Sequence, residues 1–132
     1  MTSTSTVTAD DLAARWTEFW NGALPLAPGL LADDFGIRFA SPTRAAADGL
    51  RGPGEVAAFI AEFRRGRPDL TFAIDAEAVG SLDAEGTGSC AVRWHAEPTR
   101  HSGIDILTAV AGKLVRVWSV TGSDLFTEDA SG

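Results

Sequence analysis

The stretch GTGSCAVRWHAEPTRHSGIDILTAVAGKLVRVWSVTGSD, residues 86–124, decides the fold of this chain. It predicts three adjacent β-strands over residues 87–97, 103–110 and 113–121. Ala111 and Gly112 are expected to form the turn between the last two strands, because glycine readily takes the positive φ that a two-residue hairpin loop demands. The two strands on either side of this turn are therefore antiparallel neighbours.

Alternation of side chains along each strand sorts the three strands into two sets of residues. One set carries ionisable groups among large apolar side chains and contains Arg93, His95, Asp105, Leu107, Leu114, Arg116 and Trp118. The other set is almost wholly apolar and contains Val92, Trp94, Ile104, Ile106, Thr108, Val115 and Val117. The pattern predicts one ionisable face and one apolar face.

The expected register brings members of the ionisable set together. The turn at residues 111–112 places Asp105 opposite Trp118 and makes Arg116 a diagonal neighbour of Asp105, at about 7–8 Å between Cα atoms. If the loop between the first two strands is symmetric about Arg100, His95 lies beside Asp105. A slip of two residues would keep the face, whereas a slip of one would move the side chains to the opposite face.

The composition is that of an ordinary globular protein. With 132 residues, we expect one domain over residues 8–126 and flexible tails at 1–7 and 127–132. The net charge of −7 disfavours a nucleic-acid partner, because such binding rests on clustered Lys and Arg. No apolar run approaches the roughly 20 residues of a membrane helix, and the N-terminus lacks the basic and apolar regions of a signal peptide.

Cysteine and histidine are scarce. The single cysteine, Cys90, excludes an intramolecular disulfide and fits a reducing cytosol, so a cytoplasmic location is expected. Two histidines and one cysteine without close ligand spacing argue against a metal site. We expect no metal and no cofactor.

The N-terminal half of the chain predicts helices. Thr8 followed by Asp11 resembles a capping box, so a helix is expected to begin there. Trp16, Phe19 and Trp20 fall at helical spacing and form an apolar stripe. Most of these aromatic side chains are expected in the core, and one or two could line a pocket.

The remaining elements complete the order of helices and strands. We expect a helical turn over residues 29–34, a strand over 35–40, an irregular loop at the mouth of a site over 43–52, a helix from Pro53 to Gly66 and a strand over 69–79. Helices come early and antiparallel strands follow, which is typical of an α+β fold with helices on one face of the sheet.

Four segments in this order carry a resemblance to a known family. They are the aromatic first helix, LLADDFGIRFASP at residues 30–42, GPGEVAAFIAEFRRGRPDL at 52–70 and GIDILTAVAGKLVRVW at 103–118. The chain resembles the nuclear transport factor 2-like superfamily, and within it the SnoaL-like polyketide cyclases and ketosteroid isomerase-like proteins. The likeness covers residue 12 to about residue 126.

The resemblance implies a cone-shaped α+β barrel, in which three N-terminal helices pack on a strongly bent mixed or antiparallel sheet with a pocket between them. It also implies a homodimer through the outer sheet face. Relatives such as ketosteroid isomerase, limonene epoxide hydrolase and scytalone dehydratase act on small, mostly apolar molecules, and other members have no known catalysis, so the fold alone does not define the function.

Two interpretations of the ionisable face are open. Such a face is usually solvated, and the apolar face then forms the core. Against this, Leu107, Leu114 and Trp118 share the ionisable face, and the resemblance implies that Asp105 of the GIDIL segment points into the pocket. In that case a second subunit would bury the apolar face.

The second interpretation defines a candidate site. Asp105 is the expected general base for proton abstraction next to a carbonyl, His95 shares that role or holds a substrate oxygen, and Arg93 or Arg116 stabilises the enolate. Burial would raise the pKa of the carboxyl group, and nearby cations would lower it. The expected pocket residues are Trp16, Phe19, Trp20, Phe39, Ser41, Phe59, Phe63, Leu107, Trp118 and Val120.

Departures from the relatives narrow the chemistry. His95 and Val120 stand where the epoxide hydrolases have carboxylates, and Phe39 and Ser41 replace their Tyr and Asn, which argues against epoxide hydrolysis. The chain has no Tyr for the oxyanion site of ketosteroid isomerase. The expected function is therefore enolisation, cyclisation or isomerisation of an apolar carbonyl compound. The alternatives are a non-catalytic small-molecule binder, an accessory dimeric domain and, less favoured, an epoxide hydrolase or dehydratase.

Overall fold

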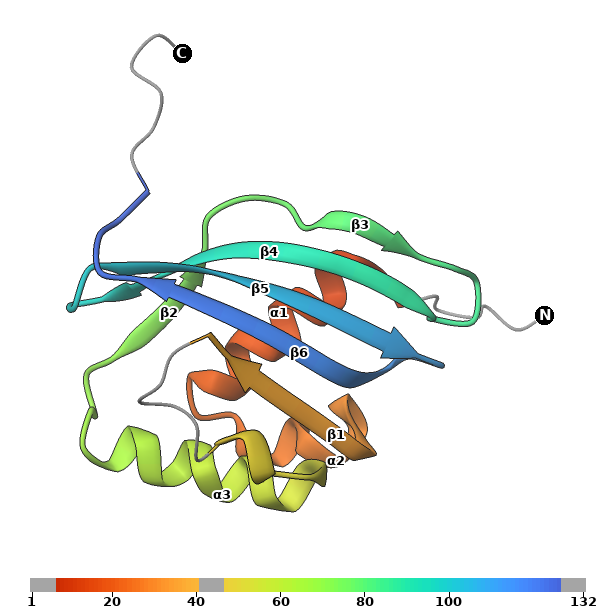
Figure 1. The fold of residues 1–132 in the computed structure, drawn as a ribbon, viewed down its shortest axis with the longest axis horizontal. Coiled ribbons are helices and arrows are strands. Elements are labelled where there is room, and N and C mark those ends of the chain that lie inside the picture. The colour runs from red at the N-terminus through yellow and green to blue at the C-terminus, as the bar shows by residue number, and fades with distance from the viewer. Residues whose placement is uncertain (1–6, 41–46, 127–132) are drawn as a thin grey trace, which may run out of the picture.

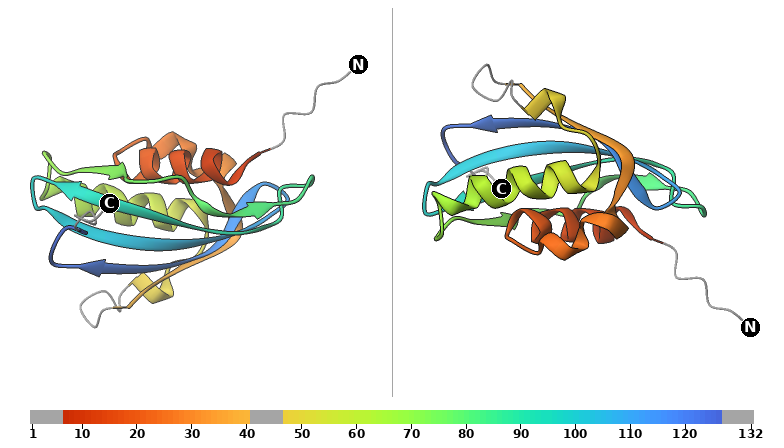
Figure 2. Two further views of the ribbon diagram at one scale, coloured as in Figure 1. Left: turned by 90° about the horizontal axis from the view of Figure 1, so that it is seen from above. Right: turned by 90° about the horizontal axis from the view of Figure 1, so that it is seen from below.

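The computed structural model describes residues 7–40 and 47–126. Over these ranges the helices include α1 (Ala9–Trp20), the short 3-10 helix η1 (Leu24–Leu26), α2 (Ala27–Leu30) and α3 (Gly52–Arg65). The strands are β1 (Leu31–Phe39), β2 (Thr71–Ile74), β3 (Val79–Leu82), β4 (Gly88–Glu97), β5 (His101–Val110) and β6 (Lys113–Gly122). Helices lie against one face of a bent sheet, which confirms the predicted α+β class (Figures 1 and 2).

The sheet of the described residues has six strands in the order β1-β6-β5-β4-β2, with β3 also paired to β4. The pairing of β1 with β6 is parallel and the other pairings are antiparallel, so the sheet is mixed. It is not closed into a barrel. Figure 2 shows the long strands curving around α1 and α3.

Helix α1 begins where the sequence predicts. Thr8 is its N-cap, and the reciprocal hydrogen bonds between Thr8 and Asp11 complete the capping box. The apolar stripe of α1 is buried, with Trp16 only 2% exposed. Val7, assigned from sequence to the tail, packs against the core. No helix of the described ranges is long and apolar enough to cross a membrane.

Several element boundaries differ from the prediction. The helical turn ends at Leu30 and the strand begins at Leu31, because both leucines are buried and the exposed Asp33 and Asp34 are tolerated on an edge strand. The predicted strand over 69–79 is two strands, β2 and β3, which pair with successive halves of β4. The predicted mouth loop over 43–52 lies partly outside the described residues.

The β5–β6 hairpin has the predicted turn and an unpredicted bulge. Val110 pairs with Lys113, and Ala111 and Gly112 have φ of 53° and 83°. The register then shifts by one residue, because Ala109 pairs with Leu114 but Thr108 pairs with Arg116. Beyond this β-bulge every side chain of β6 lies on the opposite face from the one predicted.

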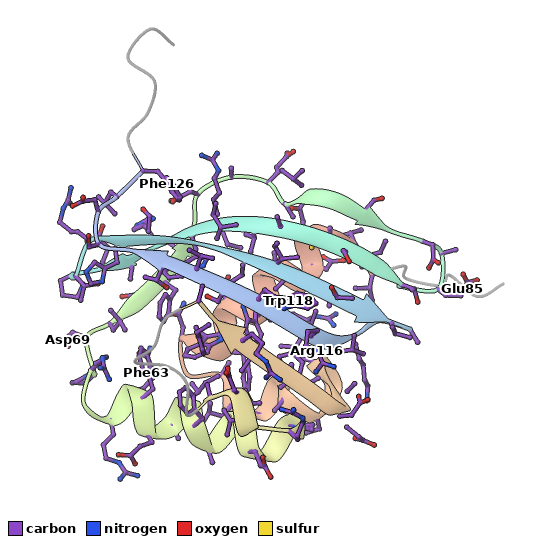
Figure 3. The ribbon with its side chains drawn as sticks, viewed as in Figure 1. Phe63, Asp69, Glu85, Arg116, Trp118 and Phe126 are labelled. Carbon is purple, nitrogen blue, oxygen red and sulfur yellow. The ribbon has the colours of Figure 1, made fainter. Side chains whose placement is uncertain are left out.

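The bulge decides which residue of β6 lies opposite Asp105. Asp105 pairs with Ser119, and Trp118 pairs with Ile106 on the outer face. Arg116 and Trp118 project from β6 on the side of the sheet turned away from the helices (Figure 3).

The β4–β5 register also differs by an odd number of residues. Ala96 pairs with His101 and Val92 with Asp105, so the connection is centred before Thr99 and not on Arg100. This three-residue difference puts Val92 and Trp94 on the inner face.

Two local features fit this register. The N–H of Arg100, at a φ of 60°, donates to the carbonyl oxygen of Ala96 in a tight turn. A Cβ atom on Gly103 would overlap the indole of Trp94. Because Gly103 has no side chain, the indole of Trp94, its cross-strand partner, can occupy that space.

Candidate active site

A cavity of about 580 Å³ lies between the helices and the inner face of the sheet. Its volume falls within the range of about 300–1,000 Å³ that is usual for small-molecule sites. The lining residues come from α1, β1, α3 and the segment after it, and the inner face of β2, β4, β5 and β6. The cavity is therefore formed by the whole fold and not by one loop.

Aromatic side chains form much of the cavity wall. Trp20 makes edge-to-face contacts with Phe63 and Phe72, at ring-centroid distances of 5.4 and 6.0 Å. Phe72 makes a similar contact with Trp94 at 5.4 Å. Trp16 contacts Trp20 at 6.0 Å. This connected set of rings gives the cavity an apolar wall suited to a flat or polycyclic molecule.

Asp105 is the acidic side chain among the described residues of the wall. Its Oδ2 accepts a hydrogen bond of 2.8 Å from Trp16 Nε1, and its Oδ1 accepts one of 3.0 Å from Trp94 Nε1. The Ser119 hydroxyl forms a third hydrogen bond with the carboxyl group. Asp105 is only 6% exposed, and burial raises its pKa above the ordinary value although these three hydrogen bonds oppose the rise.

The hydrogen bonds leave Asp105 room for a ligand. An ionised carboxylate has about four lone-pair sites, and an indole N–H can only donate. Trp16, Trp94 and Ser119 occupy three of these sites. About one acceptor site therefore remains for a group in the cavity.

Some predicted pocket residues do line the cavity: Trp16, Trp20, Phe39, Phe63 and Asp105. Others belong to the packed core and not to the wall. Phe19 and Leu107 are buried in the core, and Phe59 packs against Trp20 at a centroid distance of 6.4 Å. Ser41 lies outside the described residues.

The prediction that His95 and Asp105 share a cavity is wrong. The pairing of β4 with β5 is shifted by three residues from the expected one, and this odd shift puts His95 on the outer face. There its Nδ1 lies 2.6 Å from Asp75 Oδ1 and its Nε2 lies 3.5 Å from Glu97 Oε2. Arg93 is on the same outer face of β4.

The β-bulge explains the other misplaced residues. It turns Arg116, Trp118 and Val120 outward, and Trp118 and Val120 are 46% and 56% exposed. These residues and the outward His95 and Arg93 do not line the cavity.

Sequence reasoning missed several side chains of this site, among them Trp94, His101 and Ser119. His101 has the same parity as Asp105, so a strand begun two residues earlier would have indicated its inward position. The inward orientation of Trp94 and Ser119 depends on strand registers that no local sequence signal specifies. Among the residues that the structure describes, no group of three or more His, Cys, Asp or Glu is arranged to hold a metal ion.

No protein-family model matches this chain, and no curated protein matches it in sequence. Solved structures match its fold. A SnoaL-like protein of unknown function from Burkholderia thailandensis has a TM-score of 0.64 at 19% identity, with 89% of this chain and 99% of that chain covered. A SnoaL-like polyketide cyclase from Agrobacterium tumefaciens has a TM-score of 0.61 at 15% identity, with 90% and 93% covered.

A candidate ketosteroid isomerase from Kribbella flavida has a TM-score of 0.60 at 21% identity, with 96% of this chain and 88% of that chain covered. The fold is thus shared with SnoaL-like and ketosteroid isomerase-like proteins, as the resemblance implied.

Proposed function

We propose that the cavity binds a small, mostly apolar carbonyl compound and that Asp105 transfers a proton to or from it. One observation carries this proposal: a buried carboxyl group with a raised pKa touches a cavity whose wall is otherwise largely aromatic and aliphatic. Perturbed carboxyl groups in clefts are frequent general acids and bases. A raised pKa brings the proton affinity of the group closer to that of a useful base at neutral pH.

The proposed step is enolisation. The ionised carboxylate takes a proton from a carbon next to the carbonyl, the C–H electron pair moves into the new C=C bond, and the carbonyl oxygen becomes an enolate. The protonated Asp105 then returns the proton to the same or another carbon, which gives exchange or isomerisation. In a cyclisation the enolate carbon instead forms a C–C bond to a second carbonyl carbon of the ligand, the electron pair of that C=O bond moves to its oxygen, and Asp105 gives its proton to the resulting alkoxide. The Thr121 hydroxyl on the wall, two residues along β6 from the cross-strand partner of Asp105, is a donor available to the enolate oxygen.

The structural neighbours support this class of chemistry. They include a protein described as a polyketide cyclase and a candidate ketosteroid isomerase. Both names denote reactions at or next to carbonyl groups. We therefore propose a polyketide-like compound as the substrate.

A binder without turnover is the second candidate. Both oxygens of Asp105 are held by indoles, so the carboxylate also connects α1 to the sheet and has a structural role. The arginines expected to stabilise an enolate lie outside the cavity. Under this candidate the cavity retains a ligand and Asp105 serves only as a hydrogen-bond acceptor.

Exchange of deuterium from solvent distinguishes the two candidates. The probe is 2-tetralone, a bicyclic ketone with acidic protons next to the carbonyl. We expect the protein to accelerate exchange, since general-base catalysis contributes about 10²–10⁴-fold. The matched pair is Trp94→Phe and Trp94→Phe/Asp105→Asn, which differ only in the carboxylate. Equal exchange by both variants would exclude Asp105 as the base, and binding without exchange by the native protein would favour the binder.

A second copy of the chain is the proposed partner. The apolar patch predicted from sequence is wrong in part, because Val92, Trp94 and Val117 point inward. The outer face instead carries Ile104, Ile106, Trp118 and Val120, which are 37–56% exposed. Exposed apolar patches often mark interfaces. A cytoplasmic location likewise stays a proposal, supported by the single free Cys90.

A further inference from the structure

We propose that the ligand of this cavity carries a carboxylate, which Arg67 and His101 bind at the cavity mouth while the apolar body of the ligand extends toward Asp105. The inference rests on the proposed function only in that the cavity must hold a small molecule. It does not require proton transfer. It assigns a charge and an orientation to the ligand, and it gives Arg67 the role of selecting that charge.

The charges on the cavity wall are unlike those of the whole chain. The chain has 18 acidic and 11 basic residues. Among the described residues that line the cavity, the ionisable ones are Arg67, His101 and Asp105. Asp105 is buried and already accepts three hydrogen bonds. Arg67, Thr99 and Ser123 are exposed, so the cavity opens at their end. An anion that enters there therefore meets a cation first, in a protein whose overall charge would repel it.

Arg67 is held in place without being neutralised. Its guanidinium lies over the ring of Phe63, 4.4 Å from the centroid, and its Nη1 donates a hydrogen bond of 3.0 Å to the Phe63 carbonyl oxygen. Ion pairs within 4.0 Å in the described part of the chain involve Arg65 and His95, and Arg67 is not among them. Its other N–H groups are available, and a guanidinium matches the geometry of a carboxylate.

Polar groups cluster at the Arg67 end of the cavity. Arg67 lies over Phe63, whose ring stacks on Phe72, and Phe72, Ala96 and His101 are successive cross-strand partners, so this row of side chains leads from Arg67 to His101. Gly103 pairs with Thr121 and Ser102 pairs with Gly122, so His101 and the end of β6 lie at one edge of the sheet. Thr99, Thr121 and Ser123 add hydroxyl groups to the wall there. This end can hydrogen-bond a carboxylate from several sides.

The two ends of the cavity are separated by an aromatic section. His101 and Asp105 lie four residues apart on β5 and on the same face, which corresponds to roughly 13 Å along the strand. Trp20, Phe63 and Phe72 supply rings to the wall between helix and sheet. The arrangement fits an aromatic body of two or three fused rings with the carboxylate at one end.

Calorimetric titration with a matched pair of probes tests the inference. The probes are 2-naphthoate, which carries a carboxylate, and 2-naphthamide, which has nearly the same shape and no charge. We expect the native protein to bind 2-naphthoate at least about tenfold more tightly, because charge-assisted hydrogen bonds to a carboxylate are stronger than hydrogen bonds to a neutral amide; tenfold corresponds to about 1.4 kcal/mol. Added salt should weaken only the binding of 2-naphthoate.

Variants assign the preference to Arg67. Arg67→Met keeps an apolar stem over Phe63, and we expect it to lower the affinity for 2-naphthoate to that for 2-naphthamide while the amide affinity is unchanged. Arg67→Lys should retain part of the preference. The control is Arg65→Met, because Arg65 pairs with Glu62 on the surface and does not line the cavity.

Three results would overturn the inference. The native protein could bind both probes with equal affinity, Arg67→Met could lose the same factor of affinity for both probes, or the native protein could bind neither probe at about millimolar concentration. Its failure is distinct from that of the proposed function. If Trp94→Phe and Trp94→Phe/Asp105→Asn exchange 2-tetralone equally but the naphthoate preference persists, the proton-transfer proposal fails and the carboxylate site remains. If exchange depends on Asp105 and the naphthoate preference is absent, the carboxylate site fails and the proton-transfer proposal remains.

Discussion

Asp105 has two roles, since it connects elements of the fold and also faces the cavity. Its carboxyl group ties Trp16 of the first helix to Trp94 of the sheet, and the same group faces the cavity. Any change at this position therefore alters both the stability of the fold and the properties of the site. Experiments on Asp105 have to separate these two effects.

The pH dependence of stability reports the raised pKa of Asp105. The folded state keeps the proton at pH values where the unfolded state, with a pKa of about 3.9, has lost it. The contribution of Asp105 to the free energy of unfolding is therefore most favourable below that pKa, and it falls as pH rises through the folded pKa.

Urea denaturation of Trp94→Phe and Trp94→Phe/Asp105→Asn across this pH range isolates the contribution of the carboxyl group. We expect the Asp-containing variant to lose stability relative to its Asn counterpart as pH rises. The lowered pKa of Asp11 acts in the opposite direction and cancels in the comparison. A difference that stays constant or grows with pH would show that the folded pKa is not raised.

Asp105→Asn is expected to destabilise the native protein by about 1–3 kcal/mol. Asn offers one oxygen and one NH₂ group, so the NH₂ would meet an indole N–H that also only donates. Trp94→Phe removes one of these donors, so the double variant should be less destabilised than the sum of the two single variants. Guanidinium denaturation of all four proteins gives this coupling energy. Strict additivity would argue against the opposed donors.

Secondary-structure elements differ in how far the sequence determines them. The first helix has a local start signal in Thr8 and Asp11, and the hairpin has Gly112 at its turn, so both are predicted correctly. The bulge in β6 and the β4–β5 register have no such local signal. They depend on how side chains of distant strands pack, and an odd slip in each exchanges inner for outer residues.

Gly103→Ala tests the packing that accompanies the β4–β5 register. The added Cβ would overlap the Trp94 indole, and overpacking in a core costs about 1–3 kcal/mol. Loss of the near-ultraviolet circular dichroism of the tryptophans and a lower free energy of unfolding should accompany the change. Trp94→Phe should recover part of the loss. Gly54→Ala on helix α3, where a Cβ meets nothing within 4 Å, is the control and should not destabilise.

The whole molecule shows which features require three dimensions. The order of elements predicts the α+β class, and Asp105 is reached through the resemblance of its segment. The cavity itself combines residues from α1, α3 and five strands, and its volume depends on packing that no single segment encodes. Thus the acid could be chosen from sequence, whereas Trp94 and Ser119 could not, because two registers decide which side chains of the neighbouring strands face it.

The outer sheet face leads to the prediction of a homodimer. Ile106 and Trp118 are cross-strand neighbours, 45% and 46% exposed, and burying them against a second copy would remove their apolar surface from water. Sedimentation at micromolar concentration should give a dimer of the native protein. Trp118→Lys should give a monomer, because two copies would then place like charges in an apolar contact. Ala58→Lys, which adds the same charge on exposed helix α3, should leave the dimer intact. A native protein that sediments as a monomer would contradict the proposal and leave this face as an exposed apolar surface.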